Sequence, residues 1–168
     1  MLKLVIIALL YQEVRLIIKG DWVKCSSNNE EFLKFEMCRL RYYKKDNQEF
    51  SYYAKLLKTV THSEARLEAT FVTPKKPLNL LNLTLDGCEL LRGRKKLFAA
   101  RRIFDIIAKN TNFNHSCPYT HDIFGTNLTL DVRQIPYAVP KGKYSLKVTF
   151  NVNRGASIIV VEGFGNIL

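Results

Sequence analysis

The sequence predicts a mostly β protein, an antiparallel β-sandwich of about seven strands with one inserted helix. Three observations predict it. Most of the chain alternates apolar and polar side chains with a period of two, one segment has a helical period instead, and four cysteines are available to pair. A parallel sheet would need a helix at every crossover, so a single helix favours antiparallel strands.

The N-terminus has the form of a short secretory signal peptide. One basic residue, Lys3, precedes an apolar run, Leu4 to Tyr11, that is too short to span a bilayer. No Ala-x-Ala-like triplet precedes Gln12, so the cleavage position stays open, and a buried N-terminal strand is the alternative. We expect residues 1–11 to be the signal peptide and residues 12–168 to form a single domain without a transmembrane segment.

The strands follow from the alternating pattern. Residues 32–43 and 50–58 flank the polar turn "KKDNQE" and predict a hairpin, whose first strand changes phase near Cys38 in a way typical of a bulge. In residues 142–153 the apolar side chains fall on one face, while lysine, serine, threonine and asparagine fall on the other. The other predicted strands are residues 63–72, 80–88 and 156–161.

One segment, residues 95–110, has a helical period. Leu97, Phe104 and Ile107 recur at helical spacing, and charged side chains take the opposite side. The segment therefore predicts an amphipathic helix of about four turns between Cys88 and Cys117.

The cysteines and the glycan acceptor sequences support the secretory route. Of three possible connectivities we favour Cys25 with Cys38 and Cys88 with Cys117. The second pair closes the segment that contains the helix and constrains the unfolded chain by about 3 to 4 kcal/mol in the loop-entropy model. Three Asn-x-Ser/Thr acceptor sequences predict N-glycosylation. They begin at Asn82, Asn114 and Asn127.

The stretch "NFNHSCPYTHDI", residues 112–123, concentrates reactive side chains. A cysteine near histidine and aspartate can form a catalytic nucleophile with its general base. His115, Cys117 and His121 are also residue types that bind zinc. Their spacing matches no zinc pattern, and in an oxidising compartment Cys117 is better explained as half of a disulfide. The chain also lacks a Gly-x-Ser-x-Gly elbow and a phosphate loop, so we predict no enzyme activity, no metal and no cofactor.

The chain is strongly basic, with 26 Lys and Arg against 15 Asp and Glu and a formal charge of +11. A basic run follows Cys88, and it is either a solvated face or a docking site for anionic lipid headgroups or sulfated glycans. A nucleic-acid partner would contradict the signal peptide, and no nucleic-acid-binding motif is present. The basic run comprises Arg92, Arg94, Lys95 and Lys96.

Several motifs, in order and spacing, resemble an insect-expanded family of small secreted proteins that is known only as a domain of unknown function. They include "WVKCSS", "FLKFEMCRL", "LNLTLDGCELL", "NFNHSCPYTHDI" and "VPKGKYSLKVTFNVN". That family is similar to the lipid-recognition β-sandwiches, the group of the ganglioside activator and the Niemann-Pick type C cholesterol carrier. The resemblance implies an immunoglobulin-like sandwich whose sheets part to form an apolar pocket, and a role in handling hydrophobic chemosensory cues.

We therefore expect a secreted glycoprotein that binds a hydrophobic small molecule. The alternative is a secreted interaction protein with a filled core, which acts through its basic face on an extracellular or cell-surface partner. The sequence leaves the ligand and the oligomeric state open. The pocket candidates, each of which has ordinary core packing as its alternative, are Leu97, Ile103, Phe104 and Ile107 of the helix and Tyr52, Phe71, Phe124 and Tyr137 elsewhere.

Overall fold

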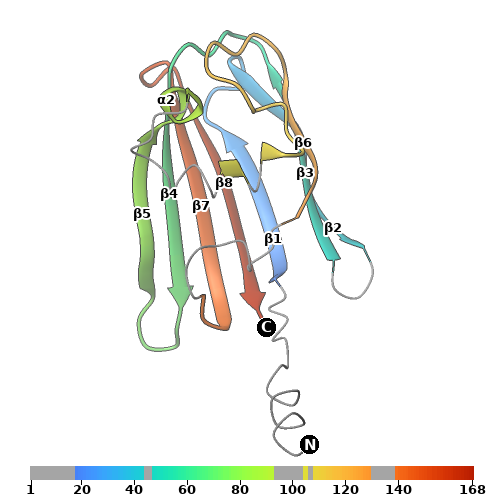
Figure 1. The fold of residues 1–168 in the computed structure, drawn as a ribbon, viewed down its shortest axis with the longest axis vertical. Coiled ribbons are helices and arrows are strands. Elements are labelled where there is room, and N and C mark those ends of the chain that lie inside the picture. Colours follow the sequence, from blue (N-terminus) through green and yellow to red (C-terminus); the bar gives the residue numbers. More distant parts are fainter. Residues whose placement is uncertain (1–17, 44–46, 93–103, 106–107, 130–138) are drawn as a thin grey trace, which may run out of the picture.

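A computed structural model describes residues 18–43, 47–92, 104–105, 108–129 and 139–168. Its strands form two antiparallel sheets, which confirms the predicted β-sandwich (Figure 1). The larger sheet has the order β1-β8-β7-β4-β5 and the smaller one the order β2-β3-β6. The strands are β1 (Ile18–Ser27), β2 (Leu33–Tyr43), β3 (Asn47–Leu56), β4 (Ser63–Val72), β5 (Leu78–Asp86), β6 (Ile123–Leu128), β7 (Gly142–Val152) and β8 (Ser157–Ile167).

The core lies between the sheets and is densest at the end where β5 leads into the short helix α2, which we call the upper end (Figure 1). Tyr119 is 1% exposed there and belongs to one buried cluster with residues of both sheets, including Leu33 of β2 and Ile159 of β8. Tyr144 and Ile167 form a second buried cluster at the opposite, lower end. The sequence does not predict Tyr119 as a core residue, because Pro118 and its neighbours have the composition of a turn.

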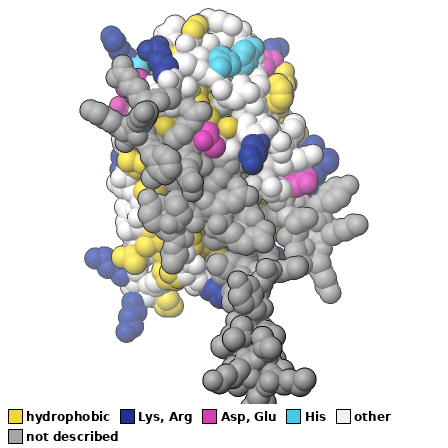
Figure 2. Space-filling view, in the orientation of Figure 1, with side chains coloured by type: hydrophobic (Ala, Val, Ile, Leu, Met, Phe, Trp, Pro, Cys, Tyr) yellow, Lys and Arg dark blue, Asp and Glu magenta, His cyan; other side chains and the backbone are white. Residues whose placement is uncertain are grey.

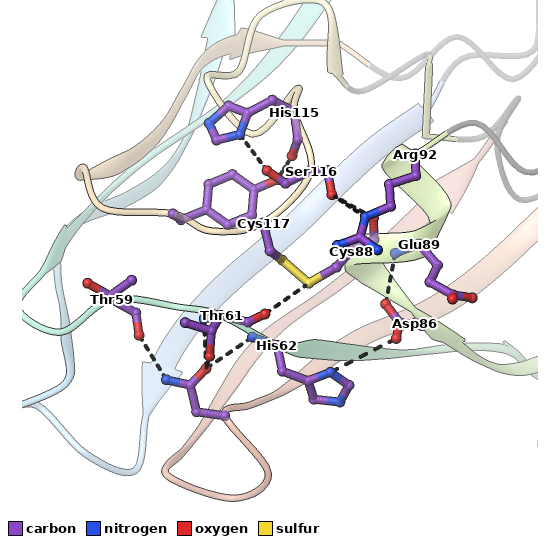
Figure 3. Close-up of a disulfide and its surroundings, with 12 residues drawn as sticks. Thr59, Thr61, His62, Asp86, Cys88, Glu89, Arg92, His115, Ser116 and Cys117 are labelled. Carbon is purple, nitrogen blue, oxygen red and sulfur yellow. Dashed lines mark hydrogen bonds and ion pairs between the residues drawn. A yellow bond between two sulfur atoms is a disulfide. The ribbon is translucent and has the colours of Figure 1, made fainter.

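Both predicted disulfides are present. Cys25–Cys38 links β1 of the larger sheet to β2 of the smaller one. Cys88–Cys117 fastens the segment before β6 to α2, beside the contact of Arg92 with Ser116 (Figure 3). The two sheets are therefore covalently joined near the middle, and the upper end is joined to the loop that covers it.

The helix α2 (Gly87–Leu91) replaces the end of the strand predicted over residues 80–88. Asp86 causes the change, because its side chain accepts a hydrogen bond from the Glu89 amide at 2.8 Å and caps the first turn. The predicted helix over residues 95–110 lies mostly outside the described residues. Phe104, Asp105 and Ala108 are the described positions of that segment with helical conformation.

Two differences concern the number and the length of the strands. The described residues form eight strands rather than about seven, and β8 continues beyond the predicted 156–161 to Ile167. Gly163 and Gly165 interrupt the apolar pattern there, which hides the strand from periodicity. Gly165 is required by close packing, since an added Cβ would lie 2.5 Å from the Lys19 carbonyl oxygen.

The predicted bulge in the first hairpin strand is confirmed between Phe35 and Met37.

The proposed signal peptide, residues 1–11, lies outside the described residues. Within the described part of the chain, no helix has the length and apolar character needed to cross a bilayer.

The two disulfides differ in loop length, which predicts different contributions to stability. Replacing Cys88 and Cys117 by alanine removes a constraint over a separation of 29 residues, against 13 for Cys25 and Cys38. The loop-entropy model gives losses in the free energy of unfolding of about 3.5 and about 3 kcal/mol, respectively. Urea unfolding of the two double variants measures both losses. A clearly larger loss for the shorter loop would show that loop entropy does not govern their contributions.

Candidate ligand-binding site

The antiparallel register places the apolar side chains of the larger sheet in rows on its inner face. Directly opposite residues share a face, so each row crosses the sheet from strand to strand. Two rows lie midway between the upper and lower ends, and we call them the central rows. One contains Leu83, Leu67, Val148, Val161 and Cys25, and the other contains Leu81, Ala69, Leu146, Gly163 and Val23.

Burial along β7 changes sharply between these rows and the ends of the strand. Tyr144 and Val152 have the same facing as Leu146, because all three occupy even-numbered positions of one strand. Tyr144 is 7% exposed and Val152 is 3% exposed, whereas Leu146 is 44% exposed. Along β7 the inner face is therefore closed at both ends and most exposed at Leu146.

The space over Gly163 agrees with this. Among the described residues, a Cβ added to Gly163 would meet the Trp22 carbonyl oxygen at 3.4 Å and the Val23 side chain at 4.0 Å. Both lie on the neighbouring strand β1, and neither belongs to the smaller sheet. Among the described residues, a Cβ at Gly163 would thus meet no atom of the smaller sheet within 4 Å.

The smaller sheet lies against one side of the larger one, which explains where the opening falls. Its strands β2 and β3 contact β1, the edge strand that carries Cys25 (Figure 1). The inner face of β3 contributes Tyr52, which lies opposite Cys38 and stacks on Phe50 at 5.5 Å. Burial raises the pKa of Tyr52 from 10.0 to about 12. The space between the sheets is thus apolar beside β1. The smaller sheet covers the inner face of the larger sheet less completely over β7 than over β1.

The predicted pocket residues divide into three groups. Phe71 shares the inner face with Tyr144, at 5.1 Å between ring centroids, and Phe104 packs on Leu85 near the upper end. Phe124 does not join them, because it lies opposite Tyr53, on the other face of the smaller sheet from Tyr52. The candidates outside the described residues are Leu97, Ile103, Ile107 and Tyr137.

The glycan acceptors are accessible. Asn82, Asn114 and Asn127 are all exposed. Asn82 lies opposite Glu68 on the outer face of the larger sheet, away from the central rows, where its side chain accepts a hydrogen bond from Arg66 at 3.2 Å. A glycan at Asn82 would therefore leave the inner face free.

Of the predicted basic run, Arg92 is described and exposed, and its Nε donates to the Ser116 hydroxyl at 3.2 Å (Figure 3). Arg94, Lys95 and Lys96 lie outside the described residues.

The stretch 112–123 is structural in its main contacts. Cys117 is oxidised, and the Asp122 carboxylate accepts from the Leu56 amide at 2.9 Å and from the Tyr53 hydroxyl at 2.5 Å. The hydrogen bond from Tyr53, followed by that from Leu56, lowers the pKa of Asp122. Across the described residues, no group of three or more His, Cys, Asp and Glu side chains is arranged to hold a metal ion.

Leu146, Val148 and Leu67 lie on apolar strand faces that the sequence predicts, but the pattern does not mark them as a candidate site. Their alternation is identical to that of a filled core, so period alone contains no signal for the opening. Gly163 is the position where a signal existed, because glycine in the interior of a strand often marks space or a close approach.

Comparison with protein families gives one match. The model of a family described as "Protein of unknown function (DUF1091)" matches residues 63–146, which is 84 of the chain's 168 residues. The matched segment includes β4, β5, α2, β6 and the first part of β7, and so contains the Cys88–Cys117 disulfide and parts of both central rows. No curated protein matches the chain.

The raised pKa of Tyr52 predicts how stability depends on pH. Below pH 10 this phenol is neutral in both the folded and the unfolded chain. Between pH 10 and about 12 the unfolded chain ionises while the folded one does not, so the free energy of unfolding falls as pH rises. Urea unfolding between pH 8 and 12 should show a weaker decline in Tyr52→Phe than in the wild type. Tyr119, whose pKa burial also raises, remains in both proteins as a common background. Parallel curves for the two proteins would contradict the prediction.

Proposed function

The chain belongs to this family of unknown function, and we propose that it is a secreted, N-glycosylated, non-catalytic protein that binds a hydrophobic small molecule, either a lipid or a chemosensory cue, between its sheets. The resemblance of its motifs to those of the lipid-recognition sandwiches supports this proposal. In such a sandwich the ligand replaces part of the core.

The observation that carries the proposal is the exposure of Leu146 on an inner face whose ends are buried. Apolar surface left in water costs about 25 cal/mol per Å² relative to burial. A ligand that covers the central rows recovers part of this free energy, less the cost of ordering the ligand. The central rows offer no charged side chain, so an apolar ligand fits them best.

The geometry also suggests the form of the ligand. Each central row crosses five strands, but the smaller sheet covers β1, so β8, β7, β4 and β5 remain, and their three spacings of about 4.8 Å give roughly 14 Å. A single alkyl chain lying along a row matches this length better than a compact polycyclic ligand does. Gly163 and Ala69 widen the second row at two of its five positions.

Secretion is supported by the two disulfides, which form and persist in oxidising compartments. The accessible acceptor asparagines support glycosylation. Asn82 lies on the outer face of the larger sheet, so a glycan there leaves the central rows free.

Filling the space tests the proposal. Leu146→Trp places a large side chain in the second central row, whereas Lys147→Trp adds the same side chain one residue later, on the outer face. We expect Leu146→Trp to reduce uptake of a fluorescent fatty acid by at least about tenfold, and Lys147→Trp to leave uptake near the wild-type value. Circular dichroism and thermal unfolding confirm that both variants are folded.

Native mass spectrometry of the secreted wild-type protein provides the second arm of this test. We expect a co-purifying apolar molecule that is depleted in Leu146→Trp. A wild-type protein that leaves culture empty and takes up no fatty acid would contradict the carrier function. Such a result would favour the alternative function, in which a protein with a filled core acts through its basic face on an extracellular or cell-surface partner.

A further inference from the structure

The outer face of the larger sheet carries a row of charges that alternate in sign from strand to strand. Each charged residue lies directly opposite the next one across the sheet and is one residue away from a member of the central row that contains Val148. The charged side chains therefore point away from the inner face. We call these four residues the outer charge row, and in order across the sheet they are Lys24 of β1, Glu162 of β8, Lys147 of β7 and Glu68 of β4.

Three charges of this row have no ionic partner in the described part of the chain. Glu68 pairs with Arg66 at 3.3 Å, whereas Lys24, Glu162 and Lys147 form no ion pair with any described residue. Lys24 and Lys147 are exposed. On the side of the molecule that Figure 2 shows, the charged side chains of the described residues are scattered, and no row of alternating sign is visible. The outer charge row is therefore available to a second molecule.

The order of the charges makes the outer charge row complementary to itself. A two-fold axis that runs along the strands, between β8 and β7, turns the row end for end over a second copy. Lys24 of one copy then faces Glu68 of the other, and Glu162 of one copy faces Lys147 of the other. An axis along the row would instead place each charge opposite the same charge, which is destabilising. The first axis is therefore the favoured one.

The rows on either side of the outer charge row fit the same axis. The first neighbouring row has no charged side chain, and in the second Arg66 of one copy faces Ser26 of the other. Neither row brings like charges together. The first row contains Trp22, Phe164, Ser145 and Thr70, and the second contains Ser26, Val160, Thr149 and Arg66.

An aromatic pair supplies the apolar part of the contact. Trp22 is 46% exposed, although it stacks on Phe164 at 6.5 Å between ring centroids. The two-fold axis places Trp22 over Thr70 of the other copy and Phe164 over Ser145 of the other copy. Tryptophan is among the residues that contribute most to protein–protein contacts when they become buried.

The area of this face is sufficient for a specific dimer. Four strands about 4.8 Å apart, each about ten residues long, cover roughly 600 Å², so two copies bury about 1,200 Å² in total. This value reaches the lower end of the range for stable interfaces. The strand β5 lies outside the overlap. Asn82, which continues the outer charge row beyond Glu68, therefore lies past the edge strand β1 of the other copy, where a glycan has room.

We propose that the protein forms a two-fold symmetric homodimer through the outer face of its larger sheet, with the outer charge row fixing the arrangement of the two copies. The strands of the two sheets are then close to aligned, which is a common way for two sheets to pack face to face. Both inner faces remain outside the contact, so the dimer does not depend on the proposed ligand.

Analytical ultracentrifugation of the secreted, glycosylated chain over a range of concentrations tests the dimer. We expect a mass of two chains that falls to one chain on dilution. The fluorescence maximum of Trp22, the single tryptophan of the chain, should move to longer wavelength as the dimer dissociates. Lys147→Glu and Glu162→Lys each place like charges face to face, so each should weaken the dimer by at least about tenfold. Lys34→Glu, at an exposed position of β2, is the matched control and should leave the dimer unchanged.

Mixing the two charge variants tests the axis itself. Lys147→Glu in one copy is complementary to Glu162→Lys in the other, so the mixture should form a heterodimer while each variant alone stays monomeric. Each variant keeps the like charges that it has placed side by side within its own sheet, so only a contact between chains explains the recovery. Trp22→Ala removes apolar contact without a change of charge and should weaken the dimer as well.

Four results would overturn the proposed dimer. They are a wild-type chain that stays monomeric up to about 1 mM, a dimer that persists undiminished in folded Lys147→Glu, a dimer undiminished in Trp22→Ala, and absence of a heterodimer from the mixed variants. Circular dichroism shows that each variant is folded. Because the fatty-acid test depends on Leu146 of the inner face, its failure is distinguishable from failure of the dimer.

Discussion

The pairing of β4, β7 and β8 is the constraint on which the rest of the structure depends. Leu67, Val148 and Val161 lie opposite one another across these strands, and this register sends all three to the inner face. Because side chains alternate with a period of two, a slip of one residue would bring Lys147 inside and expose the apolar rows. The hydrophobic pattern fixes the register strongly, and every feature of the interior follows from it.

The interior is closed at its ends by different means. At the upper end, Tyr119 packs between the sheets, and the Cys88–Cys117 disulfide holds its loop against α2. At the lower end, Tyr144 and Ile167 close the face without a covalent link. The smaller sheet is tied to β1 by Cys25–Cys38, so it covers that side of the larger sheet while Leu146 stays exposed.

Much of this fold could be predicted from the sequence, and the failures have identifiable physical causes. The alternation of apolar and polar side chains predicted β4, β7 and the inward direction of Leu83. The even number of cysteines, and the position of Cys25 and Cys38 in neighbouring strands, predicted the disulfides. The helix α2 was missed because one side chain, Asp86, ends the strand by capping. Exposure of Leu146 depends on where the second sheet lies, and the contact of His115 with His121, whose Nε2 atoms are 2.9 Å apart, depends on loop conformation. Neither is encoded in local periodicity.

The central claim is that the middle of the inner face receives an apolar ligand. Methyl NMR of the protein during titration with oleate tests it most directly, because it reports each row separately. The account predicts shifts at Leu146, Val148 and Val161, with Val152 and Ile159 of the closed upper end unchanged. Absence of shifts, or shifts confined to outward-facing positions such as Ile158, would contradict it.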